Sequence, residues 1–291
     1  MLPQGFPERM LHLLGEAEFA EFLASYERPR SAGLRLNPRK PLPDGASLPF
    51  CEAQVPWEPN GYYVCEGSRP GLHPWHDAGA YYLQEPSAMA PARLLDAQPG
   101  ERVLDLCAAP GGKAAAMAEY MGGTGRVYAW DVHAHRVDIL NAVARRLRLD
   151  NLRGALRDAT ALREGLLNEM DAVLLDAPCS GLGMLGNKPD AKFRYEDARV
   201  DELVELQKRL LDTVCQYVRP GGALVYSTCT VLPEENEAQV RAFLASHPEF
   251  HLAPFPVPEA YASGLKDHML ALYPHLNGCE GFFIARMERD G

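Results

Sequence analysis

Residues 102–113 read RVLDLCAAPGGK, an apolar run that enters a turn made of small residues. The run is typical of a buried strand, and the Ala-rich segment 113–121 that follows it predicts a helix. Small residues at such a junction let the backbone approach a ligand closely, and the start of the helix offers free amides. The spacing of Gly111-Gly112 does not fit the G-x-G-x-x-G pattern, which argues against a nicotinamide cofactor. For Gly111-Gly112 alone, an ordinary turn without a ligand is an equally good interpretation.

Strands and helices alternate along the chain beyond this junction. We predict strands over residues 127–131, 152–156, 171–176 and 223–229, and helices over 133–148 and 201–218. This alternation predicts an α/β fold with a parallel sheet that helices cover on both faces. In such sheets, ligands bind at the carboxyl ends of the strands.

The N-terminal part of the chain has a different pattern. Leu and Phe occur at helical spacing over residues 6–25, and the Pro-rich stretch 41–59 favours short strands and turns. We therefore expect a small α+β N-terminal domain over residues 1–76. The larger α/β domain is expected over residues 77–291.

The bulk composition excludes several classes of protein. The 291 residues are 47% hydrophobic and 23% charged, and no apolar run reaches the length of about 20 residues that spans a bilayer. Acidic residues near the start replace the basic region of a signal peptide, so we expect a cytoplasmic protein. The seven cysteines lack zinc-type spacing, which predicts free thiols and no metal. The net charge of -10 counts against a nucleic-acid partner, although a local basic strip can act within an acidic protein.

Four acidic residues lie at the ends of successive predicted strands: Asp105, Asp131, Asp158 and Asp176. Asp131 can accept hydrogen bonds from both hydroxyls of a ribose, and Asp158 can contact an adenine amino group. Taken singly, each acid is better interpreted as a solvated loop residue or a helix cap. Together at one edge of a sheet, they suit a nucleoside with a cationic end, such as S-adenosylmethionine.

Two cysteines lie just beyond predicted strands, in DAPCSG at 176–181 and STCT at 227–230. With DLCAAPGGK at 105–113, these segments closely resemble the Nop/Sun family of RNA cytosine-5 methyltransferases. Further matching segments are RLN at 35–37, QEPSAM at 84–89, NKPD at 187–190, PEEN at 233–236 and GCEGFF at 278–283. The resemblance covers essentially the whole chain and is nearest to the bacterial branch that methylates small-subunit ribosomal RNA.

This resemblance implies a Rossmann-like methyltransferase sheet with S-adenosylmethionine as cofactor. It implies Cys229 as the nucleophile, Cys179 as the residue that assists product release, and Asp176 as a hydrogen-bond partner of the base edge. Covalent catalysis is the expected strategy, because carbon-5 of cytosine is a poor nucleophile until a thiolate adds to carbon-6. The implied cofactor-binding residues are Cys107, Ala108, Ala109, Pro110, Gly111, Gly112, Lys113, Asp131, Asp158 and Asp176.

The resemblance also implies RNA, most naturally ribosomal RNA, as partner. Among basic residues, we prefer Lys188, Lys192 and Arg194 for phosphate contacts, and Arg35 is a further candidate by resemblance. The target cytosine must be unpaired or flipped out. Arginines between residues 136 and 157 are better interpreted as a solvated helix face. A monomer is the default expectation.

Two departures from the family pattern stand out. Ala114 replaces a residue that usually carries a hydroxyl, and Cys279 replaces a residue that is commonly small. Members of the bacterial branch typically continue into C-terminal RNA-binding modules, whereas this chain ends shortly after the last predicted strand.

Three other functions compete with this interpretation. The first is methylation of transfer RNA. The second is another class of methyltransferase, which acts on DNA cytosine or on protein; in the DNA cytosine enzymes, the nucleophile lies in a Pro-Cys motif like that of Cys179. The third is a non-catalytic scaffold that binds S-adenosylmethionine and ribosomal RNA.

Overall fold

The structure, a computed structural model, describes residues 2–187 and 195–291. Its larger part is built on a nine-stranded sheet in the order β11-β12-β13-β9-β8-β5-β6-β7, with β10 paired to β13. Five neighbouring strands are parallel: β5 (Arg102–Leu106), β6 (Arg126–Asp131), β7 (Leu152–Leu156), β8 (Met170–Asp176) and β9 (Val218–Thr228). The others are antiparallel: β10 (Phe250–Leu252), β11 (Leu265–Lys266), β12 (Met269–Leu272) and β13 (Phe282–Arg289).

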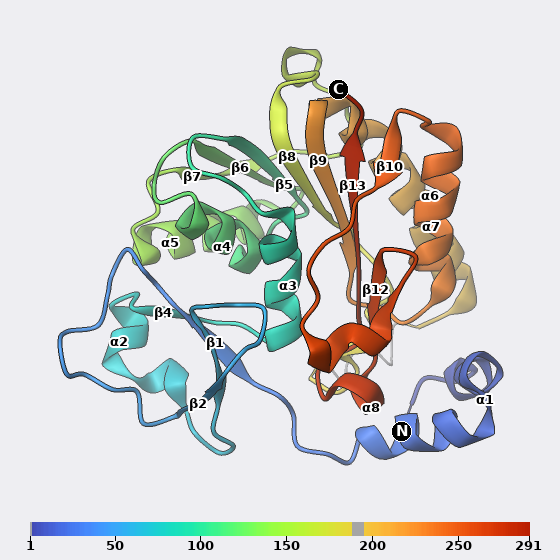
Figure 1. Cartoon of the computed structure of the whole chain (residues 1–291), viewed down its shortest axis with the longest axis horizontal. Coiled ribbons are helices and arrows are strands. Elements are labelled where there is room, and N and C mark those ends of the chain that lie inside the picture. The colour runs from blue at the N-terminus through green and yellow to red at the C-terminus, as the bar shows by residue number, and fades with distance from the viewer. Residues whose placement is uncertain (1, 188–194) are drawn as a thin grey trace.

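Helices cover both faces of this sheet, as predicted from the alternating pattern (Figure 1). One face packs on α3 (Pro86–Leu95), α4 (Gly112–Tyr120) and α5 (Ala134–Leu147), and the other on α6 (Asp197–Val214) and α7 (Glu237–Ser246). Successive side chains of a strand point to opposite faces. Val103 therefore belongs to the core under α3 and α4, and Leu104 to the core under α6 and α7.

The N-terminal strands form a separate four-stranded antiparallel sheet in the order β2-β3-β1-β4. Its strands are β1 (Gly33–Leu36), β2 (Cys51–Gln54), β3 (Gly61–Val64) and β4 (Tyr81–Leu83), and the short helix α2 (Pro74–Asp77) precedes β4. The expected domain boundary at residue 76 lies before β4, although β4 pairs with β1. The sheet therefore extends beyond that boundary.

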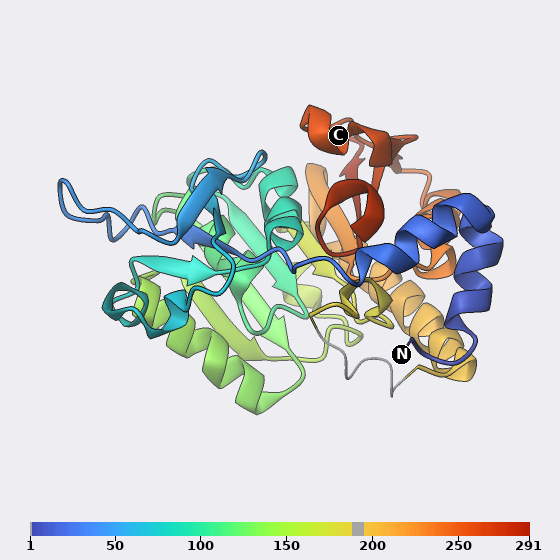
Figure 2. The same cartoon turned by 90° about the horizontal axis from the view of Figure 1, so that it is seen from below.

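The first helix, α1 (Phe6–Ser25), does not pack on this sheet. Figures 1 and 2 show it on the opposite side of the molecule, beside α8 (Pro274–Asn277). Its buried residues Phe6 and Phe22 join a core with Leu182 and Leu232 of the larger part. The helix α1 and the N-terminal sheet therefore do not share one core, and the expected division of the chain at residue 76 stays a prediction.

Two element boundaries differ from the sequence prediction for local reasons. The helix predicted over 6–25 is interrupted at Gly15, which has φ 77° and ψ 167°. The helix predicted over 201–218 ends at Val214, and a 3-10 turn leads directly into β9 at Val218. Arg219 precedes a proline, which disfavours helical backbone at that residue. Within the described residues, no helix is both long and apolar enough to cross a membrane.

Candidate active site

The two cysteines selected from the sequence lie side by side. Cys229 follows the end of β9 and Cys179 lies three residues beyond β8, and the parallel pairing of these strands sets Asp176 opposite Ser227. The Sγ atoms of Cys179 and Cys229 are 3.4 Å apart. Both cysteines are free, and as whole residues both are partly exposed.

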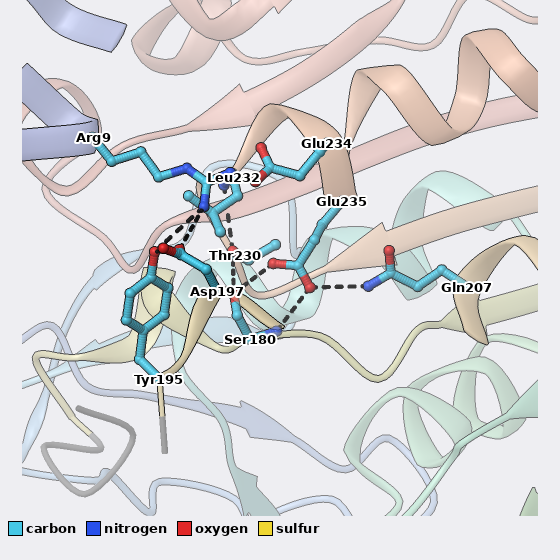
Figure 3. Close-up of polar contacts among 9 residues, drawn as sticks. All are labelled: Arg9, Ser180, Tyr195, Asp197, Gln207, Thr230, Leu232, Glu234 and Glu235. Atoms are coloured by element: carbon cyan, nitrogen blue, oxygen red, sulfur yellow. Dashed lines mark hydrogen bonds and ion pairs between the residues drawn. The ribbon is translucent and has the colours of Figure 1, made fainter. Parts of the chain in front are cut away.

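Glu235 holds the two cysteine-bearing loops together (Figure 3). Its buried carboxylate accepts hydrogen bonds from the backbone amide of Ser180 at 2.8 Å and from the Ser180 hydroxyl. The Ser180 hydroxyl also lies 2.8 Å from the hydroxyl of Thr230, which follows Cys229. Gln207 of α6 donates to Glu235 at 3.0 Å and to the carbonyl of Pro178 at 2.9 Å. These contacts hold in place the two loops that carry Cys179 and Cys229.

Asn236 fixes the turn that contains Cys229. Its side chain accepts a hydrogen bond from the hydroxyl of Thr228 and donates to the carbonyl of Thr230 at 3.1 Å. Sequence reasoning assigned no role to Gln207, Glu235 or Asn236. The PEEN segment at 233–236 was the available signal for two of them.

Asp176 lies between the cysteines and the Gly-rich turn. Its two oxygens accept hydrogen bonds from Lys113 Nζ and Ser227 Oγ, both at 2.8 Å. Burial by itself lowers the pKa of Lys113, but the Asp176 carboxylate outweighs burial and the pKa is raised. Lys113 therefore carries a fixed positive charge, and Cys229 is among the groups that interact with it electrostatically.

The environment of Cys179 disfavours the loss of its thiol proton. The hydrogen bond to Cys229, followed by burial, raises the pKa of the Cys179 thiol well above its usual range. The two sulfur atoms lie within hydrogen-bonding distance, and either of them can be the donor. A cation such as Lys113 near a cysteine favours the thiolate form, and the thiolate is the nucleophile.

The Gly-rich turn has the tight shape that the small residues predicted. Gly111 caps α4 with φ 106°, and an added Cβ would lie 3.1 Å from the side chain of Leu140. A Cβ on Gly112 would lie 2.9 Å from the ring of Tyr82. Cys107 adopts a left-handed backbone with φ 59°, which is uncommon for a residue with a side chain. The first amides of α4 face the space at this edge of the sheet.

Comparison with known proteins identifies the family. The family model described as 16S rRNA methyltransferase RsmB/F matches residues 92–288, and that of the N-terminal domain of 16S rRNA methyltransferase RsmF matches residues 2–86. The chain belongs to the RsmB/RsmF family.

Individual relatives agree with this assignment. The chain is 35% identical to the probable ribosomal RNA small subunit methyltransferase B of Synechocystis sp., over 98% of this chain and 67% of that protein. It is 34% identical to ribosomal RNA small subunit methyltransferase F of Cronobacter sakazakii, over 97% of this chain and 63% of that protein. With the Bacillus subtilis methyltransferase B, the chain covers 52% of the relative, so it spans about half to two thirds of these relatives.

Solved structures share the fold over nearly the whole chain. A methyltransferase homologue from Pyrococcus horikoshii superposes with a TM-score of 0.79 at 28% identity, covering 98% of this chain and 99% of that one. NSun6 from Pyrococcus horikoshii, solved with SFG, gives a TM-score of 0.84 at 19% identity, covering 99% of this chain and 98% of that one. The predicted Rossmann-like methyltransferase sheet and the family resemblance are confirmed.

S-adenosylmethionine is the cofactor of this RsmB/RsmF-family protein, and the site has the charge to hold it. Asp105 is completely buried, and neither of its oxygens has a hydrogen-bond partner among the described residues. Burial, and then the nearby Asp176, raise the pKa of Asp105 well above its usual range. Burial disfavours the charged form of this carboxyl group, so a cation brought beside it would stabilise the carboxylate, and the methionine end of the cofactor is cationic.

The other predicted cofactor acids differ in their surroundings. Asp131 ends β6, is buried, accepts a hydrogen bond from the amide of His133 at 3.0 Å and lies 3.3 Å from Arg136. Asp158 is exposed, and one of its oxygens accepts from the amide and the hydroxyl of Thr160 at 2.9 and 2.7 Å. Asp158 caps its own turn at the rim of the site, and its contact with adenine stays a prediction.

The RNA-binding prediction for Arg35 is wrong. Its side chain is fully buried and forms an ion pair with Glu119 at 2.8 Å, so it cannot reach a phosphate. Lys188, Lys192 and Arg194 lie outside the described residues.

A hollow that the sequence analysis did not predict lies beside the loop that follows Cys179. Its lining includes Arg28, Arg30, Gly183 and Asn187.

Proposed function

We propose that this protein transfers a methyl group from S-adenosylmethionine to carbon-5 of a cytosine in small-subunit ribosomal RNA, through a covalent bond to Cys229. The observation that carries the proposal is the 3.4 Å approach of the two sulfur atoms beside the Lys113–Asp176 pair. A scaffold that only binds RNA needs neither thiol. Membership of the RsmB/RsmF family supports ribosomal RNA as the substrate class.

The first step is addition of the Cys229 thiolate to carbon-6 of the cytosine ring. Asp176 hydrogen-bonds the base edge and supplies or holds a proton at nitrogen-3 of the base, which draws electrons from carbon-6 and makes the ring a better acceptor. The new carbon–sulfur bond leaves electron density on carbon-5, which then acts as the nucleophile. The cofactor supplies the methyl group that carbon-5 takes up.

Product release requires the loss of a proton from carbon-5. When a base removes this proton, the electron pair re-forms the ring double bond and expels the Cys229 thiolate. Cys179 is 3.4 Å from the sulfur of Cys229, within reach of carbon-5 of a base bonded to it. A thiol with a raised pKa gives a strongly basic thiolate, which suits this role.

The hollow lined by Arg28 and Arg30 is a suitable place for the RNA backbone. Gly183, which also lines this hollow, donates its amide to the carbonyl of Cys229 at 3.0 Å. Both arginines are exposed. Phosphates in the hollow would place the adjoining nucleotide near the cysteines, as an unpaired or flipped base. Lys188, Lys192 and Arg194 remain further candidates from the sequence.

Transfer of labelled methyl groups tests the proposal. The substrates are small-subunit ribosomal RNA and transfer RNA from cells that lack the gene, with 5-methylcytosine measured by nuclease digestion and mass spectrometry. We expect wild type to modify ribosomal RNA, Cys229→Ala to be inactive, and Cys179→Ala to accumulate a protein–RNA adduct on denaturing gels. Activity of Cys229→Ala with loss of activity in Cys179→Ala would exchange the two roles. Modification of transfer RNA alone would change the substrate class, and tight RNA binding without transfer would favour a scaffold.

A further inference from the structure

Arg35 contacts both ends of the helix that begins at the cofactor turn. Its Nε atom lies 2.8 Å from a carboxylate oxygen of Glu119, near the end of α4. A second guanidinium nitrogen donates to the carbonyl of Gly112, the first residue of α4, at 3.4 Å, and the third donates to the side chain of Gln84. One side chain from the N-terminal sheet thus contacts α4 at its first residue and again near its end.

The sequence of α4 explains how this is possible. Gly112 and Glu119 are seven residues apart, about two helical turns, and therefore lie on the same face. Side chains of a helix point toward its N-terminus, so Glu119 reaches back to the guanidinium. The residues of α4 include Ala114, Ala115 and Ala116, all fully buried, whose small side chains let neighbouring elements approach closely.

Residues at the end of the N-terminal sheet also pack against the Gly-rich turn at the start of α4. The position where a Cβ of Gly112 would lie is 2.9 Å from the ring of Tyr82 and 3.3 Å from the amide of Gln84. Gln84 in turn donates to the carbonyl of Ala88 at 2.9 Å, which fixes its own orientation. The first turn of α4 is therefore enclosed by residues at the end of the N-terminal sheet.

We propose that Arg35 is a positioning residue for the cofactor site, which sets the place of the first turn of α4. Gly112 and Lys113 are adjacent, so a shift of the Gly112 carbonyl also moves Lys113, which lies 2.8 Å from Asp176. The free amides at the start of α4 would move with it. Arg35 touches neither cofactor nor RNA in this role, and it acts through the backbone of Gly112.

A simpler role for Arg35 is the neutralisation of Glu119. Removing one partner of a buried ion pair leaves an uncompensated charge, whereas replacing both partners by apolar residues is often tolerated. The two roles therefore differ in the double variant. If Arg35 only neutralises Glu119, the variant Arg35→Met/Glu119→Leu binds the cofactor normally. If Arg35 positions Gly112, this variant folds but still binds weakly.

The matched control is Asn37, two residues along the chain from Arg35. It is buried at the same contact between the two parts and donates to the carbonyls of Gly79 and Leu147, both at 2.8 Å. It has no hydrogen bond to α4 among the described residues. Asn37→Ala thus weakens the same docking without touching the cofactor turn.

The experiment measures S-adenosylmethionine binding by calorimetry and the midpoint of thermal unfolding, on the full chain without RNA. We expect Arg35→Lys and the double variant to raise the Kd by about tenfold or more, the loss expected for a hydrogen bond from a charged group. Asn37→Ala should lower the midpoint and leave the Kd unchanged. A wild-type Kd in the double variant, or an equal rise of the Kd in Asn37→Ala, would overturn the proposal. Arg35→Lys and the double variant keep the test decisive even if Arg35→Met alone fails to fold.

Discussion

Lys113 and Asp176 form an ion pair of 2.8 Å that joins the cofactor turn to the strand end beside the cysteines. The pair is mostly enclosed, with 14% of the Lys113 side chain and 28% of the Asp176 side chain exposed. Ser227 holds the other oxygen of Asp176, so the carboxylate has little freedom to turn. The Asp176 carboxylate thereby links the cofactor turn, through Lys113, to the cysteines where the base is expected to bind.

Asp176→Asn should lower the rate of methyl transfer by about a hundredfold or more, since an amide cannot supply or hold the proton at nitrogen-3. Its size is unchanged, so folding should persist. The measurement is the single-turnover rate at saturating RNA and cofactor, with thermal unfolding as the control. A rate within about threefold of wild type would exclude a proton-handling role for this carboxylate.

Product release should accelerate as the pH rises. In the free enzyme, the hydrogen bond to Cys229 and burial raise the pKa of Cys179, and burial persists once Cys229 is bonded to the base. At any pH below the pKa of Cys179, raising the pH by one unit increases the fraction of the basic thiolate by about tenfold. Decay of the protein–RNA adduct after rapid mixing measures this step. A rate that does not change with pH would show that another group removes the proton.

Asp105→Asn should stabilise the protein at neutral pH and weaken cofactor binding. The folded-state pKa of Asp105 is raised, so its stabilising contribution is full below the unfolded-state pKa and is lost as the pH rises through the folded-state value. At neutral pH the wild type must either take up a proton at Asp105 or bury a charge there, and asparagine requires neither. We expect the midpoint of unfolding to rise by roughly 2–4 °C for each kcal/mol gained, with a smaller gain in acid. A lowered midpoint at neutral pH would contradict this account.

Glu235→Gln should slow transfer without changing cofactor affinity. Glu235 accepts hydrogen bonds from Ser180 and Gln207, and glutamine keeps the shape but loses one accepting oxygen. We expect a loss of about tenfold in rate, the cost of a hydrogen bond to a charged group. The neighbouring Glu234→Gln, which removes an ion pair with Arg9 instead, is the control. Equal losses in both variants would mean that the effect is not specific to the cysteine loops.

Replacing Arg28 and Arg30 together by alanine should weaken RNA binding and reduce its dependence on salt. Each lost contact to a single-stranded phosphate lowers the slope of log K against log salt by about 0.7. The matched control removes two exposed arginines, Arg145 and Arg153, from the vicinity of α5. Filter binding over a salt series measures both. A larger effect of the control pair would move the RNA path to the face of α5.

The ends of the parallel strands were predictable from the sequence, because a local run of apolar residues determines where each strand lies. Apolar runs fixed β6 and β8, so the places of Asp131 and Asp176 followed from the sequence. Gln207 was not predictable, since one polar residue on an amphipathic helix reads as a solvated side chain, and its partner Glu235 is 28 residues away. Arg35 was misassigned because its buried partner Glu119 lies 84 residues further along the chain.

The packing of α1 has a consequence for how the chain acquires its structure. Glu18 contacts His275 at 3.1 Å across 257 residues, and Arg9 contacts Asp197 across 188. Such pairings give a high contact order, and folding slows as contacts span longer loops. During synthesis, the first helix emerges long before the segment that buries its apolar face. The apolar core that α1 shares with Leu182 and Leu232 is therefore completed late, and the apolar face of this helix stays exposed on the nascent chain until then.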